Sequence, residues 1–166
     1  MKKKVILVDK NDNQIGPAEK IKAHKEKKLH RCFSVLIFNS QGEFLIQQRA
    51  KNKYHSALLW SNTCCSHPRP NKDIKKEAQR RLKQEMGIKC DNLKEIFTFT
   101  YYADFRELAE HEFDHVFIGK FDGKPKPNKK EAENWKWISK KDLKKDIKQN
   151  PKKYTYWFPI ILDKLK

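Results

Sequence analysis

The sequence predicts a mixed α/β or α+β sandwich, folded as a single domain over residues 1–166. Short runs rich in β-branched and aromatic residues, which are typical of strands, recur along the whole chain. Segments with helical spacing stand among them, without the regular alternation that parallel βαβ units require. A length of 166 residues suits one domain with a packed core of its own.

The first part of the chain is predicted to consist mainly of strands. A short strand covers Val5 to Asp9, and after a turn the segment from Ala18 to Lys28 is polar. Apolar runs at Phe33 to Phe38 and Glu43 to Gln48 flank the turn residues Asn39-Ser40-Gln41-Gly42, which predicts a β-hairpin. Ser61 to Pro68 comes shortly before a helix, so we expect a loop that leads from a strand into that helix.

The clearest predicted helix runs from Asp73 to Met86. Asp73 can cap its start and Gly87 its end. Its apolar residues recur every four positions and form one stripe, made of Ile74, Ala78, Leu82 and Met86. The rest of the chain predicts strands at Phe97 to Tyr102, Glu112 to Gly119 and Trp135 to Ile138, a helix opened by Ser139 and Asp142, and a last helix over Phe158 to Leu165.

The chain is strongly basic, with 38 Lys and Arg against 21 Asp and Glu and a net charge of +17. Such a charge attracts phosphates, nucleic acid or acidic membranes, although a lysine-rich solvated surface explains it equally well. The four cysteines lack a CxxC pair, and the adjacent Cys64 and Cys65 do not suit a disulfide framework. Because no secretory signal or membrane-length apolar run is visible, we expect a cytoplasmic protein.

Several polar residues suggest chemistry. Cys65 stands two residues before His67, so it is either a reactive thiol or a small buried residue. In a strand, Glu110 and Glu112 would share one face, where two carboxylates repel unless a cation or a proton lies between them. The alternative is a solvated strand edge. Together, these glutamates and three histidines would suit a divalent transition ion, the histidines being His24, His30 and His67.

Glu85 lies near the end of the predicted helix and shares a face with Glu77 and Arg81. This spacing is typical of an ordinary surface ladder of charge pairs. The functional alternative is a carboxylate that holds Mg²⁺ on a diphosphate.

Together, these segments resemble the type 1 isopentenyl diphosphate isomerases of the Nudix superfamily. The order and spacing of the matching motifs hold over nearly the whole chain. The motifs are Lys20 with His24, Leu29 to Val35, Gln48 to Lys51 with Lys53, Trp60 to Pro70, Arg80 to Leu82, Glu85 to Ile88, Phe99 to Ala103, Glu110 to Asp114, and Thr155 to Phe158. The segments Asn-Thr-Cys-Cys-Ser-His-Pro and Glu-His-Glu carry most of the specificity.

Residues 66–88 also resemble a Nudix box that has lost most of its carboxylates. The box is G-x5-E-x7-R-E-U-x-E-E-x-G-U, with U a bulky aliphatic residue. This chain replaces four of its positions, with Ser66, Lys72, Arg81 and Gln84. It keeps Arg80, Leu82, Glu85, Gly87 and Ile88. Such a loss removes the multi-metal cluster that activates water, as expected of the isomerase branch.

The resemblance implies a Nudix-like mixed-sheet α/β/α sandwich whose N-terminal extension completes a metal site. It implies interconversion of isopentenyl and dimethylallyl diphosphate, with Glu112 as acid, Tyr101 as its helper, Cys65 as base and Trp157 against the carbocation. One divalent ion, Mn²⁺, Zn²⁺ or Mg²⁺, would be bound by His24, His30, His67, Glu110 and Glu112. Mg²⁺ on the diphosphate would be bound by Glu85, and the diphosphate itself by Lys20, Arg49, Lys53 and Arg81.

Two rival functions follow from the residues. The first is a Nudix pyrophosphohydrolase, and the loss of carboxylates from the Nudix box argues against it. A nucleic-acid-binding module is motivated by the charge and by tryptophans among basic residues, but no recognised binding motif supports it, the tryptophans being Trp60, Trp135 and Trp137. We expect a small-molecule diphosphate as partner, no nucleic acid or membrane, and a monomer or weak homodimer. Without the resemblance, Trp157 reads as part of an aromatic cluster that pins the last helix.

Overall fold

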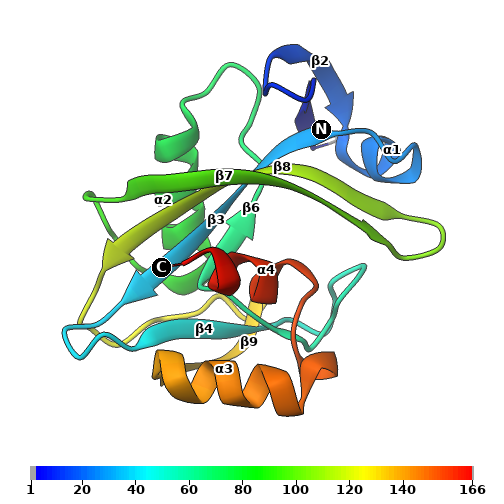
Figure 1. Ribbon diagram of the computed structural model, residues 1–166. Coiled ribbons are helices and arrows are strands. Elements are labelled where there is room, and N and C mark those ends of the chain that lie inside the picture. The colour runs from blue at the N-terminus through cyan, green and yellow to red at the C-terminus, as the bar shows by residue number, and fades with distance from the viewer. Residues whose placement is uncertain (1–2, 166) are drawn as a thin grey trace.

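The computed structural model describes residues 3–165, and its centre is a mixed β-sheet with helices on both faces (Figure 1). This confirms the predicted mixed α/β class. The elements in chain order are β1 (Lys4–Val8), β2 (Gln14–Glu19), α1 (Lys20–Lys25), β3 (His30–Phe38), β4 (Phe44–Arg49), β5 (Trp60–Ser61), β6 (Cys64–Ser66), α2 (Ile74–Met86), β7 (Lys94–Asp104), β8 (Ala109–Lys120), β9 (Ala132–Ile138), α3 (Lys140–Gln149), η1 (Pro151–Lys153) and α4 (Trp157–Lys164).

Strand β3 organises the sheet. It pairs in parallel with β8 along its whole length, from His30 beside Glu112 to Phe38 beside Lys120. It also pairs antiparallel with β1, β4 and β6. The predicted hairpin is present, but β3 and β4 pair only next to their turn, and β4 then continues alongside β9. The two strands therefore diverge, and this divergence makes room for a cavity.

Alternation along β3 divides the core into two layers, as the period of a strand requires. Phe33, Val35 and Ile37 pack with α2, whereas Leu36 packs with α3 and α4 on the other face. The even-numbered residues of β3 and β8 thus point to the face that α4 covers. Toward one end of this face the apolar residues give way to polar ones, and the cavity opens there.

Helix α2 forms as the sequence predicts. The Asp73 carboxylate accepts a hydrogen bond from the Lys76 N–H at 2.8 Å, and Gly87 ends the helix with a φ of 69°. A side chain at Gly87 would also meet the Lys126 carbonyl oxygen at 2.7 Å. Ala78, Leu82 and Met86 are buried against the sheet, and Ile74 packs at the edge of that cluster.

The prediction of a loop over Ser61 to Pro68 is wrong for half of that segment. It contains the end of β5 and the whole of β6, and β6 pairs with β3 through Cys64 and Cys65. Polar side chains support the backbone here: Thr63 Oγ1 accepts from the Ile37 N–H at 2.9 Å and donates to the Leu45 carbonyl at 2.6 Å. Because these buried positions are not apolar, the segment lacks the alternation that identifies a strand.

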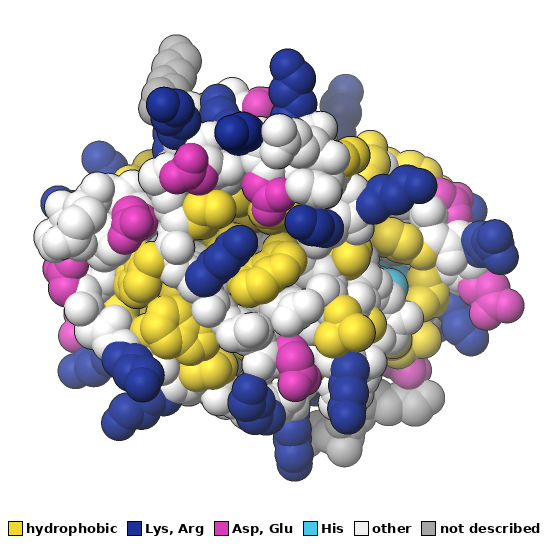
Figure 2. All heavy atoms as spheres, turned by 90° about the horizontal axis from the view of Figure 1, so that it is seen from below, with side chains coloured by type: hydrophobic (Ala, Val, Ile, Leu, Met, Phe, Trp, Pro, Cys, Tyr) yellow, Lys and Arg dark blue, Asp and Glu magenta, His cyan; other side chains and the backbone are white. Residues whose placement is uncertain are grey.

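Residues 3–28 are more regular than predicted, because β2 runs into the polar stretch from Ala18 to Lys28 and α1 lies within it. The basic charge is spread over the surface: on the side of α3, lysine and arginine side chains stand among acidic and apolar ones (Figure 2). Within residues 3–165, no helix is both long and apolar enough to cross a membrane.

Candidate active site

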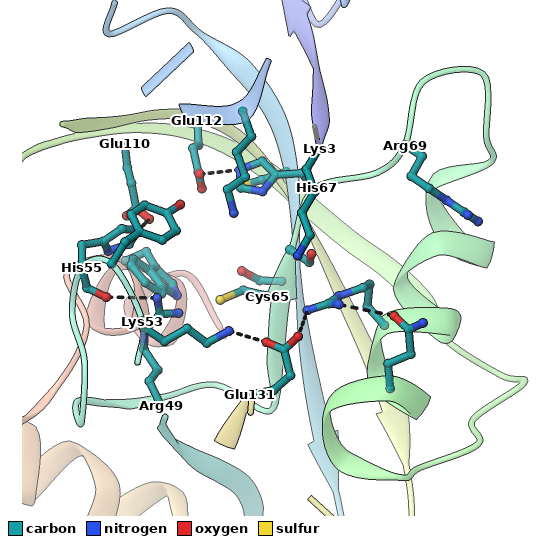
Figure 3. Close-up of a pocket in the computed structure, with 18 of the residues that line it drawn as sticks. Lys3, Arg49, Lys53, His55, Cys65, His67, Arg69, Glu110, Glu112 and Glu131 are labelled. Atoms are coloured by element: carbon teal, nitrogen blue, oxygen red, sulfur yellow. Dashed lines mark hydrogen bonds and ion pairs between the residues drawn. The ribbon is translucent and has the colours of Figure 1, made fainter. Parts of the chain in front are cut away.

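A cavity of about 900 Å³ opens on the α4 side of the sheet. Side chains from β3, β6, β7, β8, α2 and α4 line it, together with residues 49–55. Histidines and glutamates lie on one side, basic residues on another, and the Cys65 thiol points into the space between them (Figure 3). The candidate residues from distant parts of the sequence are thus brought together in one place.

Three histidines and one glutamate form a compact group at the upper end of the cavity. His24 comes from α1, His30 from β3, His67 from just after β6 and Glu112 from β8, and their ligand atoms all lie within 4.8 Å of one another. The parallel pairing of β3 and β8 sets His30 beside Glu112. Glu112 Oε1 lies 2.9 Å from His67 Nε2, 3.4 Å from His30 Nε2 and 3.9 Å from His24 Nε2.

The ring orientations suit a cation. His24 Nδ1 lies 2.8 Å from the Lys20 carbonyl and His30 Nδ1 lies 2.8 Å from the Lys28 carbonyl, so each Nδ1 carries the hydrogen. The Nε2 lone pairs then face the group, and His30 Nε2 lies only 3.1 Å from His67 Nε2. Burial lowers the pKa of His24 to about 4 and that of His67 well below its usual range, which favours neutral imidazoles. Neutral imidazoles and a carboxylate are the donors that a divalent transition ion prefers.

Glu110, also predicted as a ligand, lies beside this group rather than in it. As predicted, it shares the buried face of β8 with Glu112, while His111 points to the other face. Its Oε1 lies 2.9 Å from His55 Nε2, and its Oε2 lies 3.2 Å from the Tyr101 hydroxyl oxygen. The alternative of a solvated strand edge is therefore wrong.

Tyr101 links the two carboxylates. Its hydroxyl donates to Glu112 Oε2 at 2.6 Å, on the opposite side of that carboxylate from the histidines. Burial and the Glu112 charge raise the pKa of Glu110 well above its usual value. Burial also acts to raise the pKa of Glu112, but its close interactions with His67 and His30 outweigh burial and lower that pKa. The pair therefore holds one proton, on Glu110.

Cys64 and Cys65 point to opposite faces of β6. Cys64 belongs to the α2-side core, whereas Cys65 lines the cavity and packs with the α4-side residues. Burial in the cavity wall raises the pKa of the Cys65 thiol to about 12, although the Arg49 charge acts in the opposite direction. The thiol is therefore protonated at neutral pH.

Trp157 opens α4 and forms an aromatic wall of the cavity. It is 2 % exposed, and the His55 ring meets it edge-on at 6.3 Å between ring centroids. Tyr101 lies at the same centroid distance, 6.3 Å, tilted toward the indole. The Arg49 guanidinium lies over its ring at 5.4 Å. Trp157 thus lines the cavity beside Tyr101 and His55, and it also packs the last helix against the body of the protein.

The basic residues predicted for a diphosphate all line the cavity: Lys20, Arg49, Lys53 and Arg81. Burial lowers the pKa of Lys20, whose ammonium lies 5.2 Å from the Tyr54 ring. Arg49 donates to the carbonyl oxygens of His55 and Ser56, so it also holds the segment that carries Lys53. Glu85 is 3 % exposed and accepts from Arg81 at 2.6 Å, so a surface ladder is wrong for this residue.

Comparison with known proteins identifies the family. The NUDIX domain model matches residues 28–158. An isopentenyl-diphosphate Delta-isomerase 2 of Aromatoleum aromaticum is 48% identical, over 99% of this chain and 87% of that protein. An isopentenyl-diphosphate Delta-isomerase of Serratia proteamaculans is 47% identical, over 99% and 92%. The chain belongs to the isopentenyl-diphosphate Delta-isomerase family of NUDIX proteins.

Solved structures confirm the NUDIX fold and with it the predicted α/β/α sandwich. The DR0079 protein of Deinococcus radiodurans superimposes with a TM-score of 0.82 over 97% of this chain and 98% of that one, at 16% identity. A MutT protein of Methanosarcina mazei gives a TM-score of 0.65 over 81% and 91%, at 20% identity. His24 precedes residues 28–158, which the NUDIX model matches, so α1 contributes one member of the histidine group from outside the matched range.

Two residues of this NUDIX cavity escaped the sequence analysis. His55 is buried and contacts Glu110, Trp157 and the Phe105 ring, the last at 5.0 Å between centroids. Glu131 accepts hydrogen bonds from both Lys53 and Arg81. Neither belongs to a pattern in the sequence, and for His55 the available signal was its position two residues after the predicted Lys53.

Proposed function

We propose that this chain interconverts isopentenyl diphosphate and dimethylallyl diphosphate. One observation carries the proposal: a carboxylate–tyrosine pair and a thiol line the same cavity, which has an aromatic wall and basic residues at one side. The names of the curated relatives agree with this activity. An eroded NUDIX box with Lys72, Arg81 and Gln84 opposes hydrolysis of a phosphoanhydride.

The reaction needs an acid, a base and shelter from water. A proton is added to the terminal carbon of the alkene, a tertiary carbocation forms, and a proton leaves the carbon on its other side. Because an alkene is a very weak base, the acid must be positioned closely and water must be excluded. The reverse reaction uses the same two groups with their roles exchanged.

Glu112, with Tyr101, is our proposed acid, and Cys65 our proposed base. The proton held by Glu110 is one hydrogen bond from the Tyr101 oxygen, and the Tyr101 hydroxyl donates to Glu112 at 2.6 Å. This series of hydrogen bonds could pass a proton from Glu110 through Tyr101 to Glu112 while the cavity stays closed to water. Cys65 is a thiol at rest, the state in which it would donate a proton in the reverse direction. In the forward direction it would first lose that proton to solvent, and the resulting thiolate would be a strong base.

Trp157 is our proposed stabiliser of the carbocation. Its face is buried beside Tyr101 and His55, so a cation in the cavity would meet the ring without intervening water. A desolvated cation–π contact contributes about 2 kcal/mol.

The cluster of His24, His30, His67 and Glu112 fits a divalent ion, and we propose Mn²⁺, Zn²⁺ or Mg²⁺ there. We propose Glu110 as a further ligand, which would have to turn from His55 toward the ion. When bound, such an ion would supply positive charge that holds the Glu112 carboxylate in place. We propose that Glu85 holds Mg²⁺ on the diphosphate, which Lys20, Arg49, Lys53 and Arg81 bind with charged donors. We further propose a single domain over residues 1–166 that acts in the cytoplasm as a monomer or weak homodimer, without nucleic acid or membrane as partner.

The test is direct. Purified protein is incubated with isopentenyl diphosphate and Mg²⁺, the product is identified by NMR, and free phosphate is measured in parallel. Formation of dimethylallyl diphosphate without phosphate release supports the proposal. Release of phosphate without an allylic product would instead assign the chain to the pyrophosphohydrolases.

A further inference from the structure

Glu131 lies across two cations of the proposed diphosphate site. It stands in the turn before β9, and its carboxylate points into the cavity between Lys53 and Arg81 (Figure 3). One of its oxygens accepts from the Lys53 ammonium, and the other accepts from Arg81 Nη2 at 3.1 Å. Lys53 and Arg81, the proposed phosphate-binding residues, therefore both donate hydrogen bonds to the Glu131 carboxylate.

Arg81 has a second carboxylate partner. The same Nη2 atom donates to Glu85 Oε1 at 2.6 Å, and Glu85 is fixed from its other side by Gln47 Nε2 at 3.1 Å. The positive charges of Lys53 and Arg81 are thus balanced by the negative charges of Glu85 and Glu131. These four side chains together carry no net charge, whereas other basic residues line the rest of the cavity, among them Lys20, Arg49 and Lys130.

A diphosphate without a bound cation would meet two carboxylates, Glu85 and Glu131, next to the two cations, and this disfavours its binding there. A diphosphate that reaches Lys53 and Arg81 must either displace Glu131 or lie next to it, and like charges at such range repel strongly in a partly buried site. A divalent cation on the diphosphate changes the sign of this interaction, because the two carboxylates then face positive charge.

We propose that Glu131 determines which form of the ligand enters: it makes the cavity select the magnesium complex of a diphosphate over the free anion. This inference rests on the proposed function, because it takes Lys53 and Arg81 as the diphosphate anchors. Glu131 acts here through its charge and its hold on the two cations, and it takes no part in proton transfer.

The test measures equilibrium binding of inorganic pyrophosphate by calorimetry. The titration is made in buffer freed of divalent ions on a chelating resin and again with saturating Mg²⁺, for the wild type and for Glu131→Gln. The matched control is Glu133→Gln, which also removes one negative charge. Glu133 lies two residues after Glu131, in β9, and is not among the residues that line the cavity. Removing one adjacent like charge should tighten binding of free pyrophosphate about tenfold. The preference for the magnesium complex should shrink by a similar factor, and Glu133→Gln should match the wild type.

Further variants separate the possible failures. Lys53→Met should weaken binding of both forms, and if it changes neither, the diphosphate site itself is misplaced. If Lys53→Met weakens binding but Glu131→Gln binds free pyrophosphate no more tightly than the wild type, the role of Glu131 is refuted. Glu131→Asp keeps the charge but is too short to span both cations, so it should give a smaller gain. It replaces the Gln variant if the latter does not fold.

Discussion

The indole Nε1 of Trp157 donates a hydrogen bond to Asn62 Oδ1 at 3.1 Å. Asn62 is fully buried, and its own amide donates to the carbonyl oxygens of Val35 and Cys64 at 3.2 and 2.8 Å. The plane of the indole is therefore fixed by the central strand β3 and by β6, which also carries Cys65. The orientation of Trp157, the aromatic wall of the cavity, therefore depends on the same strand that carries Cys65, the proposed base.

For Trp157 we expect activity to follow the π-face as well as the volume of the side chain. Trp157→Leu should lower kcat roughly thirtyfold, because about 2 kcal/mol of cation stabilisation is lost. Trp157→Phe keeps a weaker π-face and should retain more activity. The two variants are compared at matched thermal stability, since both lose the bond to Asn62. Equal kcat values would reduce Trp157 to a packing residue.

The two cysteines should differ sharply in their effect on turnover. Cys65→Ala and Glu112→Gln should each abolish measurable isomerisation while the circular dichroism spectrum stays native, because each removes a proton donor or acceptor that lines the cavity. Cys64→Ala removes a small core side chain on the opposite face and should mainly lower stability. Loss of activity in Cys64→Ala, with Cys65→Ala still active, would show that the base has been assigned to the wrong thiol.

Metal binding should depend more on Glu112 than on Glu110. Glu112 lies within the histidine group, whereas Glu110 is held by His55 and Tyr101. Glu112→Gln should therefore lower the affinity for a divalent ion by at least tenfold more than Glu110→Gln does. Chelator competition followed by metal analysis gives both affinities. Substoichiometric metal in the reconstituted wild type, below about one tenth of an equivalent, would contradict the site itself.

Removing metal should loosen the N-terminal segment. His24 lies in α1, and a cation shared with His67 and Glu112 would tie that helix to the sheet. We expect limited proteolysis to cut within β1, β2 or α1 after chelation and to be slowed when the metal is restored. A His24→Gln variant should be cut readily with or without metal. Unchanged cleavage of the wild type would mean that the segment folds independently of the ion.

Glu77 should contribute to stability in a pH-dependent way. Burial acts to raise its pKa, but hydrogen bonds from Arg80 and Arg69 outweigh burial and lower the pKa from 4.5 to about 2. A carboxyl whose pKa is lower in the folded state stabilises the protein above the unfolded pKa and loses that effect as the pH falls toward about 2.

The corresponding measurement is urea unfolding of the wild type and of Glu77→Gln between pH 6 and pH 3. The difference in unfolding free energy should be largest at pH 6 and should shrink toward pH 3. Glu107→Gln, which changes an exposed carboxyl in the turn between β7 and β8, serves as the control and should show little difference at either pH. A Glu77 difference that does not vary with pH would assign the effect to packing.

Local patterns predicted much of the fold. The fourfold spacing of apolar residues and the caps at Asp73 and Gly87 predicted α2 almost to the residue. The strand period predicted that Glu110 and Glu112 share a face. Strands β5 and β6 were missed because their buried positions are held by the side chains of Asn62 and Thr63 instead of by apolar contacts.

The site was harder to predict in detail. The family resemblance selected residues most of which line one cavity, whereas His24, His30 and Glu85 lie behind its wall in contact with residues that line it. It could not give the directions of their side chains. Glu110 turns from the histidines because His55, from a distant segment without any motif, lies against it. Glu131 escaped for the same reason, since its partners Lys53 and Arg81 come from elsewhere in the chain. Contacts between remote segments have no local signature.

The parallel pairing of β3 and β8 has a consequence for synthesis of the chain. His30 and Glu112 are neighbours across this ladder but lie about half the chain apart in sequence. A ribosome must therefore translate well beyond the histidines before their carboxylate partner exists, and pairing between remote strands is slow to form. We therefore expect the complete set of four metal ligands to form only late in folding, after β8 has paired with β3.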